Sequence, residues 1–261
     1  MNERPLRGIA AMKPLRIMVC TATLPELPPF RLPHSSGVRH DQEEDEPDLR
    51  ARTVKVTPLR QNCTVLEDPD TGRAVVVDPG GDAPELLQLL EGMTVDAILL
   101  THGHFDHVGG ADALRAGLEK RQSAPVAMIG PDRRDAFLLE TVEDQAQAFG
   151  LYDLRNAHPD RFVVEGEVID LPAGRFEVAH CPGHTPGHVI YISRADKLAI
   201  VGDTLFRGVV GRSDFAYGDH ESLIAGIKRT LLSLPDDFVV LPGHGLPTMI
   251  GEERQNNPFL A

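Results

Sequence analysis

The residues best suited to chemistry stand together at positions 101–107, which read Thr-His-Gly-His-Phe-Asp-His in this 261-residue sequence. Three histidines and one aspartate fall within six residues there, although only 11 histidines are spread over the whole chain. Imidazole nitrogens and carboxylate oxygens are ligands that zinc and similar divalent ions take in proteins. In an extended loop, residues two apart face the same way. We therefore expect His102 and His104 to bind one ion while Asp106 and His107 turn toward another.

Further candidate ligands each follow a short apolar stretch. His184 comes after residues 175–179, Asp203 after residues 197–201 and His244 after residues 238–241, and a glycine directly precedes each of them. Strand ends followed by glycine-rich loops are where ligands and catalytic groups gather in α/β sheets. A structural zinc site is the main alternative, but closed structural sites usually hold four ligands, often thiolates. This chain offers more than four candidates and no clustered cysteines, which favours a catalytic metal centre.

The elements that must position these residues begin near residue 54, where short β-rich stretches start to alternate with helical ones. We expect strands at residues 54–59, 63–67, 74–77, 96–100, 125–129, 175–179, 188–193, 197–201 and 238–241. We expect helices at residues 85–90, 111–120 and 221–232, with a mostly helical stretch over 132–149. Mixed strands flanked by helices predict a layered α/β body.

Residues 1–52 differ in composition from the rest. Four prolines punctuate residues 25–33, and the acidic run at 41–46 lacks apolar periodicity. This composition predicts a poorly ordered leader, followed by one catalytic domain over residues 53–261. The leader is interpreted as a variable extension, or as the product of a start codon placed too far upstream, rather than as a docking arm.

Charge and cysteine content narrow the function further. The formal net charge is −13, and the first 53 residues carry equal numbers of basic and acidic side chains, so the acidic excess lies in the body. Such a surface repels a phosphate backbone, which argues against nucleic acid and favours a small-molecule substrate. No apolar run approaches the roughly 18 to 20 residues of a membrane-spanning helix, so no membrane partner is expected. Three widely spaced cysteines form no disulfide framework and favour a reducing cytoplasm.

Taken together, the motifs resemble the metallo-β-lactamase superfamily, and within it the short, single-domain bacterial relatives of glyoxalase II, the hydroxyacylglutathione hydrolases. The likeness starts near residue 54. Besides residues 101–107, it rests on Pro-Gly-His-Thr-Pro-Gly-His at 182–188, Gly-Asp-Thr-Leu-Phe at 202–206, Gly-Arg-Ser-Asp at 211–214 and Leu-Pro-Gly-His-Gly at 241–245. Gln-Asn-Cys at 61–63, Val-Asp-Pro-Gly at 77–80 and the stretch at 252–260 add to it.

The resemblance implies an α/β fold, the αββα sandwich of two mixed β-sheets with helices outside. It also implies two divalent metal ions, zinc in the first place with iron or manganese as alternatives. The first ion would be bound by His102, His104 and His184, and the second by Asp106, His107 and His244. Asp203 would bridge both ions.

The implied activity is hydrolysis of a small-thiol thioester such as S-lactoylglutathione by a metal-bridged hydroxide. Asp203 and Asp106 are the expected catalytic residues, and Asp106 has the alternative role of a proton acceptor that orients the hydroxide. His188 and Asp78 are expected to support the ligands or the substrate rather than bind metal. Arg207 and Arg212 are candidates for contact with a substrate carboxylate, as is Lys228.

Other activities share the same residues. The superfamily includes a mononuclear iron persulfide dioxygenase, and residues 211–215 resemble a segment of that enzyme, whereas the complete second ligand set favours a binuclear hydrolase. A lactonase uses the same metal pocket. A β-lactamase is disfavoured by Asp203, because that branch usually has cysteine there, and a non-catalytic metal-binding module is disfavoured by the intact ligand set.

Overall fold

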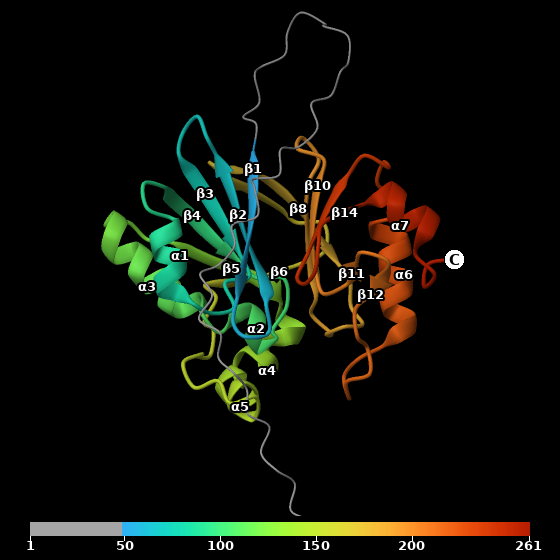
Figure 1. Ribbon diagram of the computed structural model, residues 1–261, viewed down its shortest axis with the longest axis horizontal. Coiled ribbons are helices and arrows are strands. Elements are labelled where there is room, and N and C mark those ends of the chain that lie inside the picture. The colour runs from blue at the N-terminus through green and yellow to red at the C-terminus, as the bar shows by residue number, and fades with distance from the viewer. Residues whose placement is uncertain (1–48) are drawn as a thin grey trace, which may run out of the picture.

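The computed structural model describes residues 49–261. Two six-stranded β-sheets face each other at the centre, and helices cover the outer face of each sheet (Figure 1). Both sheets are mixed, with parallel and antiparallel neighbours. The predicted αββα sandwich is thereby confirmed.

The first sheet has the strand order β1-β2-β3-β4-β5-β6. Its strands are β1 (Arg50–Val56), β2 (Gln61–Asp68), β3 (Arg73–Val77), β4 (Thr94–Leu99), β5 (Ala127–Asp132) and β6 (Arg161–Val163). The strands from β1 to β3 pair antiparallel, and those from β3 to β6 pair parallel. Parallel neighbours need a crossover connection. Helices α1 (Ala83–Leu89) and α3 (Ala111–Gln122) provide the crossovers on the outer face.

The second sheet has the order β14-β13-β10-β9-β8-β7. Its strands are β7 (Val168–Leu171), β8 (Gly174–His180), β9 (Val189–Ser193), β10 (Leu198–Gly202), β13 (Val239–Pro242) and β14 (Thr248–Met249). Helices α6 (His220–Thr230) and α7 (Ile250–Asn256) cover it, and a small hairpin joins β11 (Leu205–Phe206) to β12 (Val209–Val210). Short helical pieces also follow β4 and β5: α2 (Phe105–Val108), η1 (Arg133–Asp135), α4 (Ala136–Leu139) and α5 (Val142–Ala148).

Three apolar layers hold this sandwich together, and alternation along the strands supplies them. In β3, Val75 and Val77 face the other sheet whereas Val76 faces the helices. Burial on both faces explains why this strand reads as an uninterrupted apolar run. Tyr191 and Phe176 fill the space between the sheets, and a third cluster joins the second sheet to α6.

The predicted strands and helices are all present, with shifted ends. The largest shift is in the first strand, predicted at 54–59, which spans Arg50–Val56 because Leu49 and Ala51 are buried. The rest of the predicted leader lies outside the described residues. The sequence patterns missed β6, β7, β11, β12, β14, α2 and α7, of which β11, β12 and β14 have only two residues each. Over residues 49–261, no helix is both long enough and apolar enough to cross a membrane.

Candidate metal centre

The predicted ligands come from loops that meet at one edge of the sandwich. His102 and His104 follow β4, His184 lies between β8 and β9, and Asp203 follows β10. His244 follows β13, which is the parallel neighbour of β10 in the sheet. Segments far apart in the sequence therefore place their polar side chains in one space.

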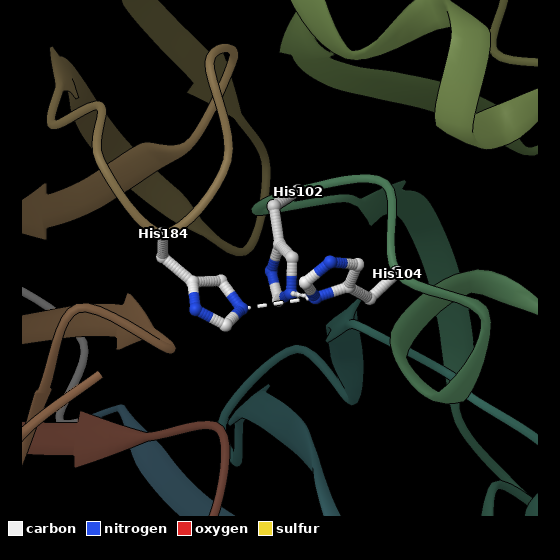
Figure 2. A group of neighbouring side chains, drawn as sticks. All are labelled: His102, His104 and His184. Carbon is white, nitrogen blue, oxygen red and sulfur yellow. Dashed lines mark hydrogen bonds between the residues drawn. The ribbon is translucent and has the colours of Figure 1, made fainter. Parts of the chain in front are cut away.

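His102, His104 and His184 form the first triad (Figure 2). The Nδ1 atom of His104 lies 3.2 Å from Nε2 of His102 and 2.9 Å from Nε2 of His184. All three side chains are buried. Three ring nitrogens that converge in this way are arranged to share one cation.

Asp106, His107 and His244 form the second triad. Nε2 of His244 lies 3.2 Å from Oδ2 of Asp106. The predicted turn of Asp106 and His107 away from the first ion corresponds to the short helix α2, which contains both residues and begins after His104. This turn packs against Gly80, where a Cβ atom would lie 1.5 Å from the carbonyl oxygen of Asp106. A glycine at position 80 is therefore required for the turn to form.

Asp203 lies between the two triads. Its Oδ1 atom is 3.3 Å from Nε2 of His107, and its Oδ2 atom is 3.6 Å from Nε2 of His184 and 3.7 Å from Nε2 of His244. Gly243 leaves room for this carboxylate, since a Cβ atom there would lie 2.2 Å from Oδ1. One carboxylate thus faces both groups of ligands.

Two buried atoms in this space indicate what the residues bind. Within residues 49–261, Nε2 of His107 and Oδ1 of Asp203 lie 3.3 Å apart, but neither atom makes a well-aligned hydrogen bond with the other or with any further group. Leaving such atoms unpaired costs about 1 to 3 kcal/mol each. Both belong to side chains of the kind that coordinate divalent cations. The residues therefore fit a site for divalent metal ions.

The pKa values of the first triad favour the forms that coordinate metal. Burial and the neighbouring His107 hold the pKa of His102 well below its ordinary value, and burial together with His184 lowers the pKa of His104 to about 3. Both imidazoles are therefore neutral at pH 7 and keep a free lone pair. A neutral imidazole is the form that binds a metal ion.

The carboxylates are held in their charged form. Burial opposes ionisation of Asp203, but His107 and His184 outweigh it and place the pKa far below its ordinary value. Burial also opposes ionisation of Asp106, whose pKa is nevertheless lowered by His107 and by its hydrogen bond with His244. Both side chains are charged at neutral pH, as metal ligands must be.

Asp78 supports both triads without belonging to either ligand set. Its Oδ2 atom lies 2.9 Å from Nδ1 of His107 and accepts a 2.6 Å hydrogen bond from Oγ1 of Thr101. The same hydroxyl lies 3.0 Å from Nδ1 of His102. A carboxylate that fixes the second nitrogen of a histidine sets its tautomer and ring orientation.

His188 lies beneath the first triad. Its Nε2 atom accepts a 3.0 Å hydrogen bond from the backbone N–H of Asp203. Its ring stacks on that of His102, with centroids 4.7 Å apart. Because its Nε2 atom accepts this hydrogen bond, His188 holds the backbone of Asp203 and the ring of His102 in place rather than binding metal through Nε2.

Asp135 was missed by the sequence analysis. This buried carboxylate accepts hydrogen bonds from the N–H of Gly103 (3.0 Å), the hydroxyl of Thr185 (2.6 Å) and the N–H of Gly187 (2.5 Å). It therefore joins the loop that carries His102 and His104 to the loop that carries His184. Nothing in the local sequence distinguishes Asp135 from a surface aspartate, because its partners lie more than 30 residues away in either direction.

Asn62 plays a similar part for the His244 loop. Its backbone N–H donates to the carbonyl oxygen of Gly243 (2.7 Å), and its side-chain amide donates to those of Pro242 (2.7 Å) and Gly245 (3.2 Å). These contacts account for the asparagine of the Gln-Asn-Cys segment.

The candidate substrate cations lie in three different settings. Arg207 is exposed in the β11–β12 hairpin. Arg212 forms an ion pair with Asp214, and only its carbonyl oxygen reaches the centre, 2.7 Å from Nδ1 of His184. Lys228 lies on α6, with its Nζ atom 3.4 Å from the carbonyl oxygen of Ala261.

Comparison with known proteins agrees with this geometry. The family model described as the metallo-beta-lactamase superfamily matches residues 56–244. Hydroxyacylglutathione hydrolase GloC of Haemophilus influenzae is 44% identical over 215 residues, which cover 81% of this chain and 98% of that protein. The crystal structure of the BLEG-1 B3 metallo-beta-lactamase is 34% identical, with a TM-score of 0.73 over 81% of this chain and 99% of that one.

A second similar solved structure contains metal ions. TTHA1623 in a di-iron-bound form is 39% identical and has a TM-score of 0.69, over 80% of this chain and 99% of that one. The chain belongs to the metallo-β-lactamase superfamily. It is a metal-dependent hydrolase of that superfamily.

Proposed function

We propose that this protein hydrolyses thioesters of small thiols, of the S-lactoylglutathione type, at a centre of two divalent metal ions, with zinc as the expected metal. The observation that carries the proposal is the position of Asp203 between two ligand triads. A single-ion site would require only one of these triads. The carboxylate that faces both is the feature expected of a binuclear hydrolase.

The residues divide the work of binding metal as follows. His102, His104 and His184 would hold one ion, Asp106, His107 and His244 would hold the other, and Asp203 would contact both. When bound, two such ions lower the pKa of a coordinated water toward about 7 and polarise a substrate carbonyl oxygen.

The chain's own residues prepare the site for this chemistry. Asp106 is ionised, and its Oδ2 atom lies 3.2 Å from Nε2 of His244, which holds the carboxylate within the second triad. Asp78 and the carbonyl oxygen of Arg212 fix the tautomers of His107 and His184. Because these partners are set before substrate arrives, no reorganisation is needed during the reaction.

The site favours hydrolysis of a thioester by water over a reaction that needs a cysteine of the protein as nucleophile. The two described cysteines, Cys63 and Cys181, are buried, and burial raises the pKa of the Cys181 thiol to about 12. Neither is therefore a reactive thiolate. A thiolate is a good leaving group, so the reaction needs no strong acid to protonate it. The 44% identity to a hydroxyacylglutathione hydrolase supports the same substrate class.

Hydrolysis of a β-lactam is the second candidate, because a structure described as a B3 metallo-beta-lactamase is 34% identical to this chain. The lower identity makes it the weaker candidate. Persulfide oxidation by a single iron and hydrolysis of a lactone are further alternatives, and each predicts a different product.

A substrate panel with metal analysis tests the proposal. Purified protein would be analysed for bound metals and then given S-lactoylglutathione, a β-lactam, an acyl-homoserine lactone and glutathione persulfide. We expect two metal ions per chain, release of free thiol from the thioester, and no oxygen consumption with the persulfide. Oxygen consumption, or faster turnover of the β-lactam or lactone than of the thioester, would contradict the proposal.

A further inference from the structure

Tyr217 contacts the first triad from outside the recognised motifs. Its hydroxyl oxygen lies 2.9 Å from Nε2 of His104. The other two histidines of the triad have partners of a different kind, a buried threonine hydroxyl for His102 and a backbone carbonyl for His184. His104 is therefore the member of the triad whose outer nitrogen depends on a half-buried side chain.

The direction of this hydrogen bond follows from the geometry of the triad. Nδ1 of His104 faces the Nε2 atoms of His102 and His184 (Figure 2). If Nδ1 carries the lone pair that binds metal, the proton of the neutral ring must be on Nε2. Nε2–H then donates to the phenol oxygen of Tyr217.

The phenol ring is held in place independently of His104. It stacks on Phe215, with centroids 5.4 Å apart and planes 15° apart, and meets the edge of Phe137 at 5.5 Å. Phe137 belongs to α4, whereas Tyr217 lies in the loop between β12 and α6. These aromatic contacts therefore join the two halves of the molecule beside the first triad, and they fix the hydroxyl before any metal binds.

We propose that Tyr217 is a positioning residue for the first triad. Its phenol oxygen accepts the Nε2–H of His104, which holds the ring in the tautomer that leaves Nδ1 free for metal. This role rests on the proposed metal centre and adds to it a residue from a different loop. Loss of a partner to a metal-binding histidine typically weakens metal binding by about 10- to 100-fold.

Three variants separate the hydroxyl from the ring. Tyr217→Phe removes the hydroxyl and keeps the stacking on Phe215, whereas Tyr217→Leu removes both. Tyr152→Phe is the matched control, because Tyr152 is 70% exposed and makes no ring contact with the triads. The affinity for Zn²⁺ would be measured by competition with a chromophoric chelator, and the Co²⁺-substituted proteins would be compared by visible absorption.

We expect Tyr217→Phe to weaken one of the bound Zn²⁺ ions by about tenfold or more and to alter the Co²⁺ spectrum, while Tyr152→Phe matches the wild type. Tyr217→Leu should lower the affinity for this Zn²⁺ ion by at least the same factor. If Tyr217→Phe binds Zn²⁺ with wild-type affinity, the proposal is overturned, because the hydroxyl then has no role. A loss of affinity in Tyr217→Leu would in that case be due to the aromatic ring alone. The metal readout needs no substrate, so failure of the proposed thioester activity would be seen separately in the wild-type protein.

Discussion

Oδ2 of Asp78 lies 2.9 Å from Nδ1 of His107, at the base of the metal centre. The same buried carboxylate accepts hydrogen bonds from the hydroxyl and the backbone N–H of Thr101, and that hydroxyl contacts His102. One side chain thus orients a ligand in each triad. Asp78 directly follows β3, which pairs parallel with β4, and β4 leads into the loop that carries His102 and His104.

Asp78→Asn should reduce Zn²⁺ affinity by about 10- to 100-fold without unfolding the protein, because an amide nitrogen or a weaker acceptor would face His107. Asparagine tolerates the left-handed backbone found here, with φ of 52°. Asp82→Asn is the matched control, since Asp82 has the same φ and is exposed. Competition with a chelator measures the Zn²⁺ affinity of both variants. If Asp78→Asn binds Zn²⁺ as tightly as Asp82→Asn does, Asp78 does not support the ligands.

Asp203→Ala should lower turnover of the thioester by at least about a hundredfold, which corresponds to a loss of about 2.7 kcal/mol in transition-state stabilisation. It should also reduce the metal content below two ions per chain, because the only carboxylate that faces both triads among the described residues is removed. Asp237→Ala is the control, since Asp237 pairs with Lys197 at the surface. Elemental analysis beside the rate measurement checks both effects. Near-normal turnover with full metal content would refute the bridging role.

The sequence predicted the architecture because apolar alternation and glycine turns are local signals. Runs such as the one in β3 are long enough to identify, whereas β14 has two residues and takes its conformation from pairing with β13. The sequence patterns missed helix α2 at Asp106 for a related reason. The helical turn there depends on close packing against Gly80, a contact between residues far apart in the chain.

The candidate site was predicted in part. All seven proposed ligands come together in the structure, because their residue types and motifs are distinctive. The supporting residues Asp135 and Tyr217 were missed, because an aspartate or a tyrosine has no special local pattern. Only the tertiary fold shows that Asp135 is buried between two ligand loops.

Asp135 should give the stability a distinct pH dependence. Burial raises its pKa to about 6 despite three hydrogen bonds, whereas an aspartate in an unfolded chain has a pKa of about 3.9. The folded state therefore binds this proton more tightly. The stability contributed by Asp135 is present below about pH 4 and is lost as the pH rises through about 6.

Asp135→Asn removes this titration. The variant should be less stable than the wild type near pH 5, because its amide cannot accept from both Gly103 and Gly187. The difference in free energy of unfolding should narrow between about pH 5 and about pH 7. Urea unfolding at several pH values measures it. A difference that stays constant or widens with pH would contradict the raised pKa.

Removal of residues 1–48 should leave folding and activity essentially unchanged. The proposed ligands and the three apolar clusters all lie within residues 49–261. The cut should precede Leu49, which is 3% exposed, and β1, which begins at Arg50. A protein that starts at Val54 is the comparison, because it would lose part of β1 and should be less stable. Loss of most activity in the shorter deletion would show that the leader is structural.

The last prediction concerns recognition of the thiol carrier. Glutathione carries two carboxylates, and an exposed cation near the second triad is suited to contact one of them. Arg207 is next to Phe206, whose ring lies 6.3 Å from that of His244, and its guanidinium makes no ion pair with another described residue. Arg212 differs, because Asp214 already neutralises it.

Arg207→Ala should therefore lower kcat/KM for S-lactoylglutathione by about fivefold through KM, with kcat unchanged, as expected for loss of about 1 kcal/mol of uniform binding. The effect should shrink as salt is added, because an exposed charge pair is screened. Arg212→Ala is the control and should change kcat/KM by less than about twofold. The lactoyl thioester of an uncharged thiol should be hydrolysed equally well by the wild type and Arg207→Ala. An equal loss on charged and uncharged carriers would show that Arg207 does not recognise the carboxylate, and an effect confined to Arg212→Ala would assign that contact to the other arginine.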